Sequence, residues 1–178
     1  MTLNQVDPEP VLEPHDFTAY TAMTPPETIA GDTMDHPEPT KFSSSSVPWP
    51  GSTFIIRCAT SGHVVTLLNG EITLAAPGRL DSIRWTCVET KGWLGFQNPV
   101  SGKFLGHDNN GRLICSADRH LGWENFCARM KPEGGYVLLM THQERLWHVG
   151  VREEQGLEKL AKIGDGASGA TVWDFVKV

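Results

Sequence analysis

The sequence lacks any stretch near the ~18 uninterrupted apolar residues that a transmembrane helix requires. Its first residues, MTLNQVDPEPVLEP, lack the basic start and apolar run of a secretory signal, so we expect a cytoplasmic protein. Positive charge is also scarce, with 15 Lys and Arg against 21 Asp and Glu and a net charge of −6. Because phosphate binding needs clustered cations, we expect neither a nucleic-acid partner nor a membrane partner.

Motifs of the common enzyme classes are missing as well. The sequence contains no GxSxG and no P-loop. The Gly-rich run IGDGASGA, over 163–170, follows a predicted strand but opens no predicted helix, so we interpret it as a loop and not as a phosphate cradle. It has no HExxH or paired CxxC, and its histidines do not repeat at equivalent places, so we expect no metal and no cofactor. The four cysteines lie in apolar predicted strands and are expected to be free, buried thiols: Cys58, Cys87, Cys115 and Cys127. These absences favour binding over catalysis without excluding a reaction that needs only a shaped pocket.

Residues 1–50 differ in composition from the rest of the chain. They contain nine of the 12 prolines, eight acidic residues and one basic residue, Lys41. Apolar residues are scattered there without a period, and such a segment buries too little apolar surface to offset the entropy of ordering. The sequence therefore predicts a disordered, acidic, Pro- and Ser-rich tail over 1–50 and a folded, nearly neutral domain over 51–178. The tail is expected to be a solubilising extension, with docking on a partner as the alternative.

The folded part repeats one pattern of short β-rich runs and turns about every 40 residues. The repeats span about 53–91, 92–134 and 135–178. Each opens with an aromatic residue and closes with a tryptophan that an apolar residue follows two or three positions later. The opening residues are Phe54, Trp93 and Tyr136, and the closing ones are Trp85, Trp123 and Trp173.

Three such repeats predict about twelve strands and an all-β fold. The run GLEKLAKI has helical propensity, but its place in the third repeat assigns it to a strand. A single four-stranded unit has an exposed edge and half a core, whereas three units close into a barrel capped by hairpins, which is a β-trefoil. A β-sandwich or a small propeller are the alternatives. We expect the three closing tryptophans to be buried, together with Phe54, Val65, Leu105, Leu138 and Trp147.

The second repeat, GWLGFQNPVSGKFLGHDNNGRLICSADRHLGWENFCA, resembles the fascin-like β-trefoil family. The resemblance extends from Phe54 to Val178. The sequence of the second repeat also resembles that of single-trefoil proteins of filamentous fungi. Ricin-type lectins mark the closing strand with Gln-x-Trp, a motif that this chain lacks, so we expect the chain to lie outside the classical ricin lectin group. The resemblance implies a binding module. Fascins bundle actin with four trefoils in one chain, so a monomer with one trefoil and no basic excess is not expected to bundle filaments.

Two polar loops of the second repeat hold the candidate ligand-binding residues. The loop HDNNG supplies His107, Asp108 and Asn109, and the loop SADRHLGWE supplies Arg119 and His120. Carboxylate, amide and aromatic groups together suit a sugar, provided that the two loops are neighbours. The alternative is plain turn chemistry, since Asn-Gly is typical of tight hairpins.

Three functions follow as hypotheses. The first is a non-catalytic, intracellular binding module of the fascin-like kind. The second is a carbohydrate-binding trefoil that uses His107, Asp108, Arg119 and His120. The third is a small-molecule cyclase or isomerase that uses a trefoil cavity. The identity of the partner, whether protein, glycan or small molecule, stays open at this stage.

Overall fold

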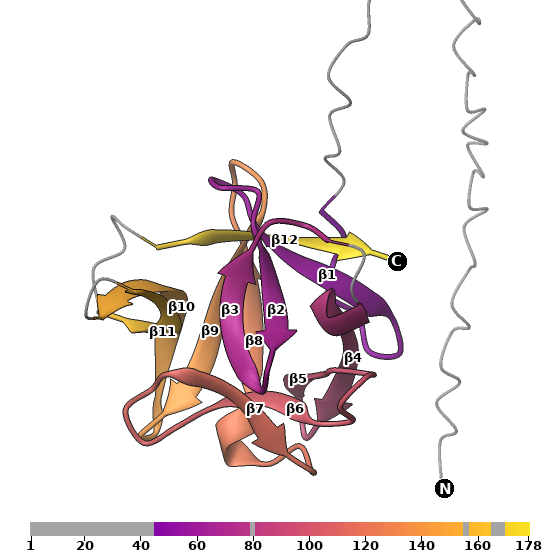
Figure 1. Ribbon diagram of the computed structural model, residues 1–178, viewed down its shortest axis with the longest axis vertical. Coiled ribbons are helices and arrows are strands. Elements are labelled where there is room, and N and C mark those ends of the chain that lie inside the picture. The colour runs from indigo at the N-terminus through magenta and orange to yellow at the C-terminus, as the bar shows by residue number, and fades with distance from the viewer. Residues whose placement is uncertain (1–44, 79–80, 155–156, 165–169) are drawn as a thin grey trace, which may run out of the picture. The chain divides into compact units, whose positions relative to one another are not determined.

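A computed structural model describes residues 45–78, 81–154, 157–164 and 170–178 of the chain. Twelve antiparallel strands and two short 3₁₀ turns make up the described domain, in agreement with the predicted all-β fold (Figure 1). The segment Leu157–Ile163 is a strand, as its place in the repeat predicted. Within the described residues, no helical segment has the length and apolar character needed to cross a membrane.

The strands follow the three sequence repeats. In the first repeat they are β1 (Thr53–Cys58), β2 (Val64–Leu68), β3 (Glu71–Ala75) and β4 (Arg84–Thr90), with the turn η1 (Asp81–Ile83) before β4. In the second they are β5 (Trp93–Gln97), β6 (Phe104–His107), β7 (Leu113–Ala117) and β8 (Phe126–Met130), with the turn η2 (Gly122–Glu124) before β8. In the third they are β9 (Tyr136–His142), β10 (Arg145–Glu154), β11 (Leu157–Ile163) and β12 (Val172–Lys177).

The first and last strands of the repeats form a closed barrel of six strands. Each strand pairs with its two neighbours in the order β1, β4, β5, β8, β9 and β12, and β12 returns to β1. The middle strands form the hairpins β2–β3, β6–β7 and β10–β11. The hairpins meet where Glu71 pairs with Ile114 and Arg112 with Ala161. A closed barrel with three hairpins is a β-trefoil, and closure removes the free edges of the barrel strands.

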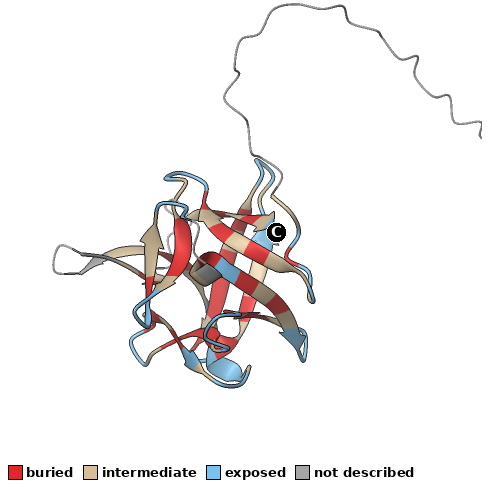
Figure 2. Ribbon diagram, turned by 45° about the vertical axis from the view of Figure 1, so that its right-hand side comes forward, coloured by how far each residue is buried: buried red, intermediate tan, exposed pale blue. Residues whose placement is uncertain are grey.

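Aromatic side chains fill the centre of the domain, because alternate residues of a barrel strand point inward. Figure 2 shows buried segments alternating with less buried ones along the strands. The ring of Phe175 lies at the middle of this cluster, 5.7 Å from Phe96 and 5.5 Å from Tyr136 between ring centroids. Trp85 and Trp173 are fully buried, as expected. The two indole N–H groups donate to backbone carbonyls of the second strand of their own repeats, at Val65 and Val149. Among the other predicted core residues, Phe54, Val65, Leu105 and Leu138 are buried, and Trp147 is partly buried against the core.

The expected burial of Trp123 is wrong, because Trp123 is 50% exposed. The strand register gives the reason. Phe54 pairs with Trp85 and Tyr136 with Trp173, whereas in the second repeat Leu94 pairs with Phe126. Phe126 is therefore the inward counterpart of the two buried tryptophans. By the same register, Leu94 and not Trp93 is the counterpart of Phe54 and Tyr136.

Residues 1–44 of the proposed tail lie outside the described residues. The prediction also assigned residues 45–50 to the tail. The first two of these residues form hydrogen bonds with β12. The backbone N–H of Ser46 donates to the carbonyl of Phe175 at 2.8 Å, and the N–H of Phe175 donates to Ser45 Oγ at 3.1 Å. Contacts of the β-trefoil thus extend back to Ser45.

Candidate functional site

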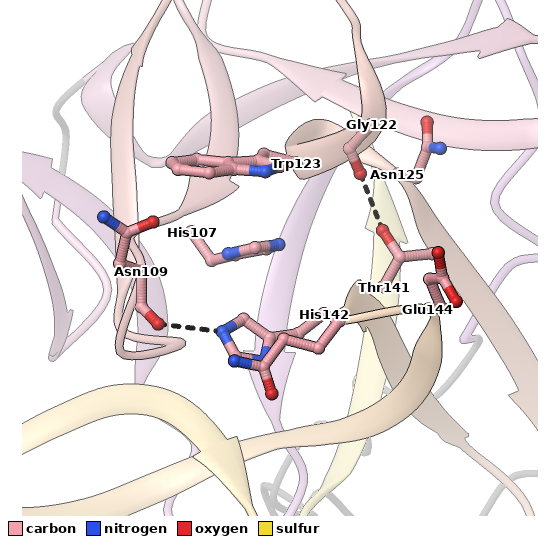
Figure 3. A pocket seen from close by; sticks show the side chains of 9 residues that line it. His107, Asn109, Gly122, Trp123, Asn125, Thr141, His142 and Glu144 are labelled. Carbon is pink, nitrogen blue, oxygen red and sulfur yellow. Dashed lines mark hydrogen bonds between the residues drawn. The ribbon is translucent and has the colours of Figure 1, made fainter.

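A pocket of about 450 Å³ opens where the turn after β6, the turn η2 and the turn between β9 and β10 come together (Figure 3). Its position follows from the fold, because the barrel brings the end of β9 beside η2 and the second hairpin. Nine residues line it: His107, Asn109, Gly122, Trp123, Asn125, Thr141, His142, Gln143 and Glu144.

An aromatic stack forms one side of this pocket. The half-exposed indole of Trp123 lies over the buried imidazole of His107, with ring centroids 5.4 Å apart and planes 20° apart. The ring of His142 meets His107 from the other side, edge to face, at 5.0 Å. Figure 3 shows the His107 ring between Trp123 and His142. The pocket therefore presents an indole face supported from behind.

The turn η2 holds Trp123 outward because its neighbour Glu124 points inward. Glu124 is 6% exposed, and its carboxylate accepts a hydrogen bond from the backbone N–H of Leu121 at 3.0 Å. The carboxylate fits beside Gly106 of β6, where a Cβ atom would lie 2.8 Å from Glu124 Oε1. Since Glu124 takes the inward position, the adjacent indole is left at the surface.

Hydrogen bonds tie the elements around the pocket to one another. Thr141 Oγ1 donates to the carbonyl of Gly122 at 2.6 Å, which joins β9 to η2. His142 Nε2 lies 3.0 Å from the carbonyl oxygen of Asn109, which joins β9 to the second hairpin. The other nitrogen of His142 lies 3.2 Å from Lys162 Nζ on β11. These hydrogen bonds therefore hold the elements around the pocket in place without a ligand.

The five predicted site residues separate in the structure. His107 and Asn109 line the pocket. Asp108 serves its own turn, where Oδ1 accepts hydrogen bonds from the backbone N–H groups of Asn110 at 2.8 Å and Arg112 at 2.9 Å. Asp108 also lines a second depression, together with Asn110, Arg112 and Arg152.

The other two predicted residues take different surroundings. Arg119 is exposed and is not among the residues lining the pocket. His120 stacks on Phe104, with centroids 5.9 Å apart, and covers Gly95, where a Cβ atom would lie 2.7 Å from the ring. Burial lowers the pKa of His120, opposed by the nearby Asn125 and Glu124. The imidazole of His120 is thus a packing group.

The sequence interpretation missed Trp123, Thr141, His142 and Glu144 as site residues. A signal for Trp123 was present in the spacing: an apolar residue follows Trp85 and Trp173 after two positions but follows Trp123 only after three. His142 and Glu144 belong to a different repeat from His107, and no short-range pattern connects the two segments. Their convergence depends on barrel closure.

Two of the described cysteines, Cys87 and Cys115, are buried thiols with raised pKa values. Burial raises the pKa of the Cys87 thiol to about 11, and the nearby Glu89 adds to the effect. Burial also raises the pKa of Cys115, although Ser101 and Lys103 oppose it. A thiol with a raised pKa is a poor nucleophile. Within the part of the chain that the structure describes, no group of three or more His, Cys, Asp or Glu side chains is arranged to hold a metal ion.

Comparison with known proteins defines the fold class. No family model and no curated protein matches the chain. The ricin B-like lectin of Macrolepiota procera, solved in complex with lactose, is 13% identical, with a TM-score of 0.61 over 75% of this chain and 100% of the lectin. The Rhizoctonia solani agglutinin is 17% identical, with a TM-score of 0.59 over 75% of this chain and 99% of its own. The designed threefold-symmetric protein ThreeFoil is 14% identical, with a TM-score of 0.60 over 71% and 99%. The chain has the β-trefoil fold.

Proposed function

We propose that this β-trefoil is a non-catalytic carbohydrate-binding module and that the pocket beside Trp123 is its sugar site. The observation that carries the proposal is the half-exposed indole at the mouth of a preformed pocket. A large aromatic face left in water at a depression is typical of binding sites. The apolar face of a pyranose ring packs on such a surface, while its hydroxyl groups need polar partners around the edge.

The edge of the pocket supplies those polar partners. Asn125 offers an amide, Glu144 a carboxylate, and Asn109 a second amide, all on segments that the fold holds in place. Such a mixture of donors and acceptors around one apolar platform suits a ligand with several hydroxyl groups. The similar solved structures add support by analogy, since they include a lectin in complex with lactose and an agglutinin.

Binding without turnover is the better match to the lining groups. Hydrolysis of a glycosidic bond ordinarily uses two carboxyl groups that flank the bond. Among the described residues that line the pocket, Glu144 carries the only carboxyl group. The buried Glu124 nearby is held by the N–H of Leu121 and supports η2.

The test is binding of neutral glycans by the full chain and by two tryptophan variants. A glycan array finds ligands, and titration calorimetry with lactose or the tightest neutral glycan measures affinity. We expect Trp123→Ala to abolish measurable binding, because it removes the stacking platform. The matched control is Trp49→Ala, since Trp49 is also exposed, at 70%, and lies outside the pocket. That variant is expected to bind like the unmodified protein.

Two results would overturn the proposal. One is the absence of binding to any glycan by the unmodified protein. The other is glycan binding that Trp123→Ala leaves unchanged. The fascin-like protein-interaction module or the cyclase then becomes the leading interpretation, and capture of a protein partner or turnover of a small molecule would be sought instead.

A further inference from the structure

His107 offers a buried hydrogen-bond acceptor that no group of the described residues uses. The side chain is 3% exposed, and Nδ1 lies 2.9 Å from the backbone carbonyl oxygen of Asp108. A carbonyl oxygen only accepts, so in the neutral ring the proton is on Nδ1 and the lone pair is on Nε2. Among the described residues, Nε2 has no hydrogen-bond partner. Buried polar atoms are usually paired, and since His107 lines the pocket, this acceptor is placed beside the space that a ligand would fill.

His142 has the opposite tautomer, which the same kind of argument assigns. Nε2 lies 3.0 Å from the carbonyl oxygen of Asn109, and Nδ1 lies 3.2 Å from Lys162 Nζ. Because the ammonium group only donates and the carbonyl only accepts, the proton is on Nε2 and the lone pair is on Nδ1. Both nitrogens of His142 are therefore occupied, and this ring has no N–H with which to satisfy His107.

The charge of the described lining residues disfavours an anionic ligand. Among the described lining residues there is no Lys or Arg, and Glu144 contributes a negative charge. The ammonium group of Lys162 lies 3.2 Å from His142 Nδ1 and 4.9 Å from the ring centroid of Trp147. A sulfate or carboxylate in this pocket would therefore face a lone pair and a carboxylate without a countercharge.

We propose that His107 Nε2 accepts a hydrogen bond from a ligand hydroxyl and thereby selects neutral sugars over acidic ones. This inference rests on the proposed carbohydrate-binding function. Lys162 is a positioning residue in it: by fixing the tautomer of His142, it holds the Asn109 turn in place and leaves His107 as the acceptor. The ligand then supplies the hydrogen-bond donor that the described residues do not provide to His107 Nε2.

The first test measures affinity after the acceptor is removed. His107→Phe keeps an aromatic ring beneath Trp123 but has no lone pair, and we expect about a tenfold loss of affinity for lactose or the tightest neutral glycan. The control is His63→Phe, which changes the same residue type outside the pocket and is expected to bind normally. For the unmodified protein, a sulfated form of the same glycan is expected to bind at least tenfold more weakly.

The second test needs no ligand. Nitrogen-15 NMR of the histidine rings in the unmodified protein is expected to show the Nδ1–H tautomer for His107 and the Nε2–H tautomer for His142. A proton found on Nε2 of the neutral His107 ring would overturn the inference even if glycans bind. Lys162→Met is expected to change the tautomer populations of His142, an effect that a purely structural role would not produce.

The outcomes separate the two proposals. Unchanged affinity in His107→Phe, or tighter binding of the sulfated glycan, refutes the role of His107 while the Trp123 test still supports a sugar site. If the unmodified protein binds no glycan, the proposed function fails and the selection of neutral sugars fails with it.

Discussion

Replacing Phe126 by alanine tests the strand register that distinguishes the second repeat from the other two. The Phe126 ring is fully buried, and its centroid lies 5.8 Å from that of Phe96. Removing a buried phenylalanine ring deletes its contacts and leaves a cavity, so Phe126→Ala should cost about 3–5 kcal/mol. That is a large share of the roughly 5–15 kcal/mol by which a domain is stable.

The stability loss of Phe126→Ala is to be compared with that of Trp123→Ala. The indole is larger than the phenylalanine ring, and the repeat pattern in the sequence predicted that Trp123 would be the core residue. With 50% of it exposed, the covered half amounts to roughly 100 Å², which at about 25 cal/mol per Å² gives an upper limit near 2.5 kcal/mol. We therefore expect Trp123→Ala to cost about 1–2 kcal/mol, clearly less than Phe126→Ala.

Urea unfolding followed by far-ultraviolet circular dichroism measures both costs, because the backbone amides dominate this signal and the midpoint does not depend on its amplitude. The midpoint should fall further for Phe126→Ala, with similar slopes for the two variants. An equal or larger loss in Trp123→Ala would show that the tryptophan, as the repeat spacing first suggested, is the core residue. The register argument would then be refuted.

Three further predictions concern stability and reactivity. Burial lowers the pKa of His120 below its ordinary value of 6.5, so the unfolded chain takes up a proton first as the pH falls. The contribution of the neutral His120 ring to the free energy of unfolding is complete above pH 6.5 and is lost on acidification. Urea midpoints at pH 7 and pH 5 should therefore differ less in His120→Gln than in the unmodified protein. With a pKa of about 11, Cys87 should resist alkylation at pH 8 in the folded protein and react after unfolding, as mass spectrometry would show; rapid labelling of the native protein would contradict its burial. Gly111 has φ +77° and a Cβ position 2.5 Å from the Lys162 side chain, whereas a Cβ on Gly122 meets nothing within 4 Å. Gly111→Ala should therefore cost about 1–2 kcal/mol and Gly122→Ala little, and similar midpoints for the two would count against strain in this turn.

Local signals were enough to predict most of the fold. Alternating apolar residues and hairpin turns recur along the chain, and both depend on neighbours within a few positions. Asn69 and Gly70 show this directly, since both have the positive φ angles, 50° and 82°, that a tight two-residue hairpin requires. The tryptophans Trp85 and Trp173 are buried for the same reason, because their strands alternate in the expected phase.

Local sequence signals predicted the candidate site only in part. His107 and Asn109 were chosen as polar groups in a hairpin turn, and they do line the pocket. Asp108 was chosen on the same ground, yet its carboxylate is used by the backbone of its own turn. A turn motif does not distinguish a side chain that stabilises the turn from one that faces a ligand.

The sequence by itself determined three repeats of four strands and hence a β-trefoil, because periodicity and turn residues act locally. Only the tertiary structure decided which ring of the second repeat enters the core. A 3₁₀ turn precedes β8, and the choice between Trp123 and Phe126 depends on pairing with Leu94 of a distant strand. The tertiary structure also decided the pocket, since His107 and His142 meet at 5.0 Å only after the barrel has closed. Contacts between segments so far apart in the chain depend on the geometry of the closed barrel, which no local pattern encodes.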